Sequence, residues 1–169
     1  MTRSRLKMKV LLTDQALLST PWLCRTITPA DTQALGQLMA LAYRGTIDDA
    51  GETLDDALKE VQAMIGGKYG PLLAACSFLI EADGQAIAAC LISLWQQAPL
   101  VADLITHPSW KNQGLGTFLL RKSMQALWSE GYKELYLFVT LGNAGAQHIY
   151  EKLGFVVVEQ IGQQSRPLA

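Results

Sequence analysis

One stretch in the second half of the chain decides how the rest is interpreted: Thr106-His107-Pro108-Ser109-Trp110-Lys111-Asn112-Gln113-Gly114-Leu115-Gly116. The apolar run Leu100–Thr106 predicts a strand leading into it, and the amphipathic run Gly114–Glu130 predicts a helix leading out. The first turn of a helix has unpaired backbone N–H groups and positive partial charge. The stretch therefore has the ingredients of a phosphate-binding turn between a strand and a helix.

Two glycines and a lysine favour that interpretation. Gly114 and Gly116 carry no side chain where a ligand must approach the backbone closely, and Lys111 adds a positive charge. The turn is neither a Walker A loop, which needs Gly-Lys-Ser/Thr, nor a GxGxxG dinucleotide fingerprint. The loop chemistry alone leaves two interpretations open: a phosphate site, or ordinary close packing between a strand and a helix.

The chain after this stretch alternates between strand and helix. Leu135–Val139 is an apolar run that predicts a strand, and Asn143 is a suitable N-cap for the next helix. Gly154 suits the end of that helix, and Phe155–Glu159 predicts a final strand.

The chain before this stretch predicts a strand at Leu23–Thr28 and then two helices. Asp31 is a candidate N-cap of the first helix, and Thr53 with Asp56 forms a capping-box pattern at the start of the second. Three strands follow as an antiparallel meander, with turns expected at Asp83-Gly84 and near Pro99.

Together these elements predict a mixed α/β fold with a largely antiparallel central sheet flanked by helices. A length of 169 residues suits one domain. We expect a variable N-terminal extension over residues 1–21, with a short strand around Lys9–Leu12, and a single domain over residues 22–169.

Composition limits the partners. Half of the residues are hydrophobic, 17% are charged and the formal net charge is -1, so neither nucleic acid nor an anionic membrane surface is an expected partner. No run approaches the roughly 20 apolar residues of a membrane-spanning helix, and a cytoplasmic protein is the expectation. Three scattered cysteines and two histidines predict no metal site.

Two motifs resemble those of the GCN5-related N-acetyltransferases. Lys111–Gly116 is similar to the family's acetyl-CoA-binding turn Arg/Gln-x-x-Gly-x-Gly/Ala, with Lys111 in place of Arg or Gln. Asn143, Ala146 and Tyr150, followed by Glu-Lys-Leu-Gly-Phe at 151–155, resemble the family's downstream signature. Both motifs stand in the family's order and at its spacing, and the resemblance extends over roughly Leu23–Glu159.

The resemblance implies a sheet splayed between the fourth and fifth predicted strands, Leu100–Thr106 and Leu135–Val139, with acetyl-CoA as co-substrate in the gap. It implies direct attack by a primary amine, from a small molecule or a peptide, in a ternary complex. The alternative is a non-catalytic acyl-CoA-binding or sensing module on the same fold. The implied cofactor-binding residues are Ile105, Thr106, Lys111, Asn112, Gln113, Gly114, Leu115, Gly116, Thr117 and Asn143.

Two residues are candidates for proton transfer. By resemblance, Tyr150 would protonate the leaving thiolate, while its place on an apolar helix stripe favours a plain core residue. Asp103 lies in an apolar strand, near where some family members carry a glutamate, and is the candidate general base. The alternative for Asp103 is a strand residue that faces solvent, and a chain of water molecules could also serve as the base.

The region between the first two helices is the expected acceptor site, because the family's selectivity usually resides there. Tyr43, Asp48, Asp49 and Glu52 are the candidate substrate-binding residues, and the acids would attract a cationic amine. The alternative is that these acids simply complement a helix dipole. Family members are often dimers, so a homodimer is a further expectation from the resemblance.

Overall fold

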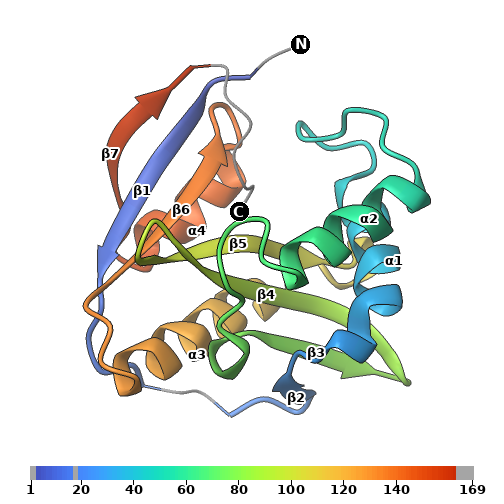
Figure 1. Ribbon diagram of the computed structural model, residues 1–169, viewed down its shortest axis with the longest axis horizontal. Helices are drawn as coiled ribbons and strands as arrows, with labels where there is room; N and C mark the ends of the chain where they lie inside the picture. The colour runs from blue at the N-terminus through green and yellow to red at the C-terminus, as the bar shows by residue number, and fades with distance from the viewer. Residues whose placement is uncertain (1–2, 17–18, 163–169) are drawn as a thin grey trace.

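The computed structural model of the protein describes residues 3–16 and 19–162. Its seven strands form one sheet in the order β2-β3-β4-β5-β6-β1-β7 (Figure 1). The strands are β1 Arg5–Leu11, β2 Leu23–Thr26, β3 Phe78–Ala82, β4 Gln85–Trp95, β5 Ala98–Thr106, β6 Glu134–Thr140 and β7 Val156–Ile161. The helices are α1 Thr32–Tyr43, α2 Leu54–Ile65, α3 Leu115–Ser129 and α4 Ala144–Lys152.

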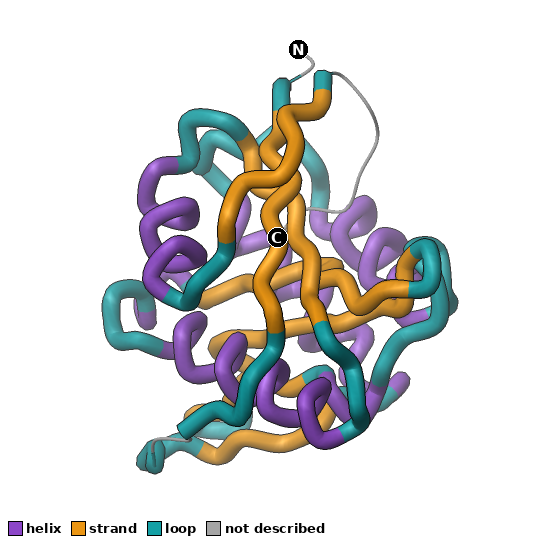
Figure 2. Tube along the Cα trace, turned by 90° about the vertical axis from the view of Figure 1, so that its left-hand side faces the viewer, coloured by secondary structure: helices purple, strands orange, loops and turns teal. Residues whose placement is uncertain are grey.

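The sheet is antiparallel except between β5 and β6. These two parallel strands pair only at Leu100 and Tyr136, and then diverge. Figures 1 and 2 show the result: β1, β6 and β7 run in a clearly different direction from β4 and β5. The predicted fold class and the splay between Leu100–Thr106 and Leu135–Val139 are therefore confirmed.

Two apolar clusters cover the two faces of the sheet. One joins α1 and α2 to β3, β4 and β5 through buried residues such as Leu35, Val61 and Leu91. The other joins α3 and α4 to the opposite face, where Leu119 and Tyr150 are buried. The helices are thus fixed on either side of the diverging strands. None of the helices in the described part of the chain has the length and apolar character that crossing a bilayer requires.

The N-terminal strand β1 lies inside the sheet, between β6 and β7 (Figure 1). It pairs with β6 from Arg5 to Leu11 and buries Leu6, Met8 and Val10, every second residue, as a half-buried strand should. The short strand expected around Lys9–Leu12 is therefore part of a longer one, which joins the same sheet as the rest of the chain.

The two turns predicted in the antiparallel meander differ in how well the sequence located them. Asp83 and Gly84 both have positive φ, as the predicted two-residue hairpin requires. The turn expected near Pro99 is present but lies earlier, at Gln96-Gln97, with φ of 49° and 67°, and Pro99 itself lies within β5 opposite Leu94. Glutamine is not a residue that marks such turns, so no local signal in the sequence pointed to it.

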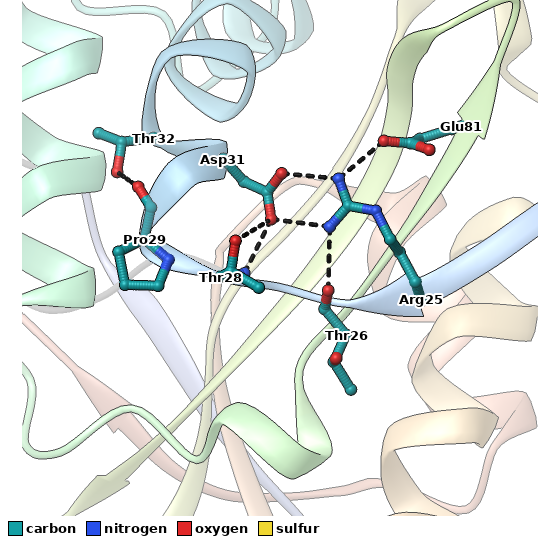
Figure 3. Close-up of polar contacts among 7 residues, drawn as sticks. All are labelled: Arg25, Thr26, Thr28, Pro29, Asp31, Thr32 and Glu81. Atoms are coloured by element: carbon teal, nitrogen blue, oxygen red, sulfur yellow. Dashed lines mark hydrogen bonds and ion pairs between the residues drawn. The ribbon is translucent and has the colours of Figure 1, made fainter.

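An ion-pair network fixes the start of α1. Arg25 on β2 donates to both carboxylate oxygens of Asp31, at 2.9 and 2.7 Å, and to Oε1 of Glu81 on β3 at 2.7 Å (Figure 3). Asp31 also accepts the backbone N–H of Thr28 at 2.8 Å. The hydrogen bonds that Asp31 accepts, chiefly those from Arg25, lower the pKa of Asp31. Asp31 is thus the predicted N-cap residue of α1, but its carboxylate serves the preceding turn.

Replacing Asp31 with Asn is expected to lower the free energy of unfolding by about 2 kcal/mol at pH 7, because charge-assisted hydrogen bonds are lost at a nearly buried site. The lowered pKa gives stabilisation that is present above about pH 4 and is lost as the pH falls through the folded pKa. Urea denaturation at pH 7 and pH 3 measures both effects. Glu81→Gln is the control and should cost less, since Arg25 keeps both contacts to Asp31; equal losses would contradict the assignment.

Candidate functional site

A cavity of about 560 Å³ opens at the predicted phosphate-binding turn, and we call it the loop cavity. It lies where β5 diverges from β6 and where α3 begins. All the predicted cofactor-binding residues line it except Gln113, which is exposed outside it. Those in the lining are Ile105, Thr106, Lys111, Asn112, Gly114, Leu115, Gly116, Thr117 and Asn143.

The start of α3 is open toward this cavity. Gly114 is its N-cap in the left-handed conformation, with φ of 80°, and no side chain caps the helix. The first backbone N–H that bonds back within the turn is that of Phe118, to the carbonyl of Gly114 at 3.0 Å. The N–H groups of the three preceding residues thus lie at an uncapped helix start, which is suited to bind an anion.

Protein packing does not explain the two glycines of the turn. A Cβ on Gly114 would meet no atom within 4 Å, and one on Gly116 would meet Leu104 and Thr106 only at 3.9 Å. Gly114 is required by its positive φ, whereas at Gly116 the space lies on the cavity side. The turn therefore fits a ligand with a diphosphate that lies against the backbone.

The β5 edge beside the loop cavity has no pairing with β6 beyond Leu100. Ile105 and Thr106 at the end of this edge line the cavity. An extended chain that enters the gap can pair with such an edge through backbone groups. Asn143 fills both expected roles: it lines the cavity, and its Oδ1 accepts the N–H of Ala146 at 3.3 Å as the N-cap of α4.

A second cavity of about 420 Å³ lies between α1, α2 and β5, and we call it the helix cavity. The predicted substrate residues Tyr43, Asp48, Asp49 and Glu52 all line it, together with Asp103. Further polar residues on and after α2 line this cavity and were not predicted from the sequence: Asp56, Glu60, Lys68 and Tyr69. For Asp56 and Glu60 the only signal was the polar face of an amphipathic helix, which usually faces solvent. Lys68 and Tyr69 lie past the end of that helix, where the sequence pattern gave no signal.

The helix cavity is negatively charged. Its lining holds six carboxylic acids, at 48, 49, 52, 56, 60 and 103, against two basic side chains, Arg44 and Lys68. Several acids also have structural roles: Asp56 completes the predicted capping box with Thr53, and Asp49 accepts the N–H groups of Gly45 and Gly51. Accepted hydrogen bonds keep these groups ionised. The acids therefore have structural roles and also give the helix cavity a negative potential.

Tyr43 and Asp48 line both cavities. Asp48 is held in place by Thr140 at the end of β6, whose hydroxyl donates to Oδ1 at 2.5 Å. The helix cavity and the loop cavity therefore adjoin at these two side chains.

A β-bulge aims Asp103 into the helix cavity. The register between β4 and β5 pairs Leu91 with Asp103 but Ile92 with Val101, so Ala102 is an extra residue on β5. In a regular strand Ala102 and Asp103 would face opposite sides, yet both line the helix cavity. Asp103 is 2% exposed, so the alternative of a solvent-facing strand residue is wrong.

The Asp103 carboxyl has few compensating partners. Its Oδ1 accepts the hydroxyl of Tyr43 and the backbone N–H of Leu104. Burial raises the pKa of Asp103 to about 7, despite the lowering effect of these two hydrogen bonds, and the charges of Glu60 and Asp48 raise it further. A carboxyl that titrates near neutrality is suited to accept a proton.

Tyr150 on α4 faces the loop cavity from the side opposite α1. It is 3% exposed, and its ring lies 5.9 Å from that of Phe155. Burial, with the nearby Cys90 and Asp103, raises its pKa. The residue is thus part of the apolar core and also borders the cavity, as each of the two interpretations required. Its phenol stays protonated at neutral pH and is suited to donate a proton.

Comparison with known proteins points to one family. The model of the acetyltransferase (GNAT) family matches residues 47–155, which include the turn at Gly114 and Tyr150. A streptothricin acetyltransferase from Streptomyces lavendulae is 33% identical over 78 residues, 45% of this chain and 41% of that protein. A mycothiol acetyltransferase from Renibacterium salmoninarum is 30% identical over 89 residues, 53% of this chain and 22% of that protein. The chain thus matches less than half the length of these two curated relatives.

A solved structure with the same fold is the GCN5-related N-acetyltransferase from Sphaerobacter thermophilus. It superposes with a TM-score of 0.74 at 18% identity, covering 99% of this chain and 53% of that one. Because the family model matches more than half of the residues, this chain belongs to the GNAT acetyltransferase family.

Proposed function

We propose that the protein is an N-acetyltransferase that moves the acetyl group of acetyl-CoA onto a primary amine by direct attack in a ternary complex. The observation that carries this proposal is that two cavities of different chemistry adjoin at Tyr43 and Asp48. The loop cavity has the open helix start for a diphosphate. The helix cavity has the acids for a cationic amine.

The residues of the loop cavity bind and orient the co-substrate in this proposal. Backbone N–H groups from Leu115 to Thr117 bind the diphosphate, and Lys111 contributes charge at the exposed rim. The free β5 edge at Ile105 and Thr106 pairs with the extended arm. The bound co-substrate supplies the thioester; the chain supplies its placement, which accounts for much of the acceleration in such reactions.

The residues of the helix cavity prepare the amine. An alkylamine is mostly protonated at neutral pH and must lose a proton before it attacks. The negative lining attracts the ammonium form, and Asp103 accepts its proton. Tyr150 then protonates the sulfur as the thiolate leaves, because its phenol keeps its proton at neutral pH until that charge develops, even though burial raises its pKa further above that of a thiol. A cationic small molecule fits this charge better than a neutral amine.

The proposal is tested by binding and by turnover. Titration with acetyl-CoA should give saturable heat and raise the melting temperature, since a ligand that binds only the folded state stabilises it. A panel of amines with a colorimetric thiol reagent should then show thiol release with cationic primary amines. ATP at the same concentration is the control and should protect less.

Two outcomes would count against the proposal in different ways. Binding of acetyl-CoA without thiol release from any amine would favour the alternative, a non-catalytic acyl-CoA-binding or sensing module. No binding at all by folded protein would remove the assignment altogether. Cytoplasmic location and a homodimer stay predictions; light scattering of the purified protein checks the second.

A further inference from the structure

Tyr43 occupies a position from which a side chain reaches both substrates of the proposed reaction. It is the last residue of α1, where the backbone N–H and the hydroxyl of Thr46 both donate to its carbonyl, at 3.0 and 2.7 Å. These bonds fix the end of the helix, and the hydrogen bond from the Tyr43 hydroxyl to Asp103 holds the ring. Tyr43 lines both cavities, whereas Asp103 lines only the helix cavity and Tyr150 only the loop cavity.

The hydrogen bond between Tyr43 and Asp103 has a defined direction. An ionised carboxylate can only accept, so the phenol donates its proton to Oδ1. A phenol oxygen that donates one hydrogen bond can still accept another, and the Tyr43 ring is only partly buried. Tyr43 therefore offers an acceptor at the junction of the cavities, with a proton-accepting carboxyl directly behind it.

The attacking nitrogen must lie at that junction. It bonds to a carbonyl carbon presented from the loop cavity, while the rest of the amine lies in the helix cavity. Asp103 does not border the loop cavity, and Tyr43 and Asp48 both line the two cavities. Of these two side chains, Tyr43 donates its hydroxyl to Asp103, whereas Asp48 accepts from Thr140. Direct transfer to Asp103 would need the nitrogen to lie deeper, away from the thioester.

On the basis of the proposed function, we propose that Tyr43 is a catalytic residue that relays the proton of the amine to Asp103. The nitrogen loses a proton to the Tyr43 oxygen as the Tyr43 O–H proton moves to Oδ1 of Asp103, which leaves a neutral phenol and a neutral carboxylic acid. The nitrogen lone pair forms the C–N bond, and the C–S bond breaks with its electron pair on sulfur. Tyr150 gives its proton to that sulfur, and the acetylated nitrogen gives its second proton to solvent to become the neutral amide. Solvent then takes the proton from Asp103 and returns one to Tyr150.

The relay needs both proton movements together. Burial and the nearby Asp103 raise the pKa of Tyr43 well above its ordinary value, so a free phenolate is not formed. The charged and titratable groups that act on the pair come from four elements: Asp48 from the loop, Glu60 from α2, Tyr150 from α4 and Arg5 from β1. The acids disfavour a second negative charge, which is a further reason for a neutral relay.

Tyr43→Phe is the test, because it removes one hydroxyl and keeps the ring. We expect kcat to fall about 100-fold with little change in the KM for acetyl-CoA, as for loss of a proton-transfer group. The hydrogen bond of Tyr43 lowers the pKa of Asp103, so the acid limb of the rate profile should also move to higher pH. If Tyr43 relays the proton, kcat of the variant stays below that of the wild type on the high-pH plateau as well.

The rate on the high-pH plateau distinguishes a proton relay from an effect of Tyr43 on the pKa of Asp103 alone. A variant that recovers the wild-type rate at pH 9.5, or that loses nothing, would overturn the relay. Rates in mixed H₂O and D₂O give a second measurement that does not depend on the variant: a wild-type plot that is linear in deuterium fraction would also overturn it. Tyr136→Phe is the matched control, since its hydroxyl binds Glu134 outside both cavities. Failure of the proposed function itself would appear separately, as wild-type protein that releases no thiol.

Discussion

Asp103→Asn is expected to lower kcat by about 1,000-fold and to remove the acid limb of the pH profile near pH 7, because the proton acceptor itself is lost. Asparagine keeps the shape of the side chain and an oxygen that accepts from Tyr43 and Leu104. The KM for acetyl-CoA should change little, since Asp103 does not line the loop cavity. Steady-state rates from pH 5.5 to 9.5 measure the effect.

The same substitution should stabilise the protein at high pH. The folded state holds a proton on Asp103 up to about pH 7, while the unfolded state loses it near pH 4. The folded state thus binds more protons in this window, and stability falls as the pH rises through it. A shift of about three pKa units, at about 1.4 kcal/mol each, makes the Asp103→Asn variant more stable by up to about 4 kcal/mol at pH 8 and by little at pH 4.

A fall in activity together with a gain in stability identifies a residue kept for chemistry. Asp55→Asn is the matched control, because Asp55 is exposed, pairs with Lys59 and lines neither cavity. It should change neither rate nor stability by much. An Asp103→Asn variant that is inactive and also less stable at pH 8 would instead mean that Asp103 supports the fold.

The sequence predicted the features that depend on near neighbours. The Thr53–Asp56 capping box and the Asp83-Gly84 turn follow from residues within one turn of each other. The predicted phosphate-binding turn also lies in one short stretch, and all but one of the predicted cofactor-binding residues line a single cavity. Local chemistry was sufficient for the capping box and the hairpin turn, whereas for the turn at Gly114 it left a phosphate site and ordinary close packing both open.

What the sequence could not show depends on pairing between distant segments. The orientation of Asp103 follows from one extra residue in β5 relative to β4. The alternation of side chains along a strand could not exclude a solvent-facing Asp103, because it does not show where such a bulge lies. The place of β1 depends on register with β6 and β7, which lie near the other end of the chain. The acids of α2 line the helix cavity because β5 forms another of its walls, and the sequence alone does not show that α2 and β5 lie close together.

Gly70→Ala is expected to cost about 3–5 kcal/mol of stability, the largest effect we predict for a change outside both cavities. Gly70 has φ of 93°, and a Cβ there would lie 1.9 Å from the carbonyl oxygen of Leu94. The obstacle is backbone, so no side-chain movement can relieve it. The segment after Gly70 also bonds to the end of β4, through Leu94 N–H to Pro71 O at 2.9 Å.

Gly131→Ala separates the collision from the strain of positive φ. Gly131 has φ of 91°, nearly that of Gly70, but a Cβ there would meet nothing within 4 Å. Its alanine variant should therefore cost only about 1–2 kcal/mol, the penalty of the left-handed conformation. Because Lys68 and Tyr69 on the wall of the helix cavity directly precede Gly70, the Gly70→Ala variant should also raise the KM for the amine. Equal losses of stability in urea denaturation would show that the contact with Leu94 relaxes freely and that the wall is not held by it.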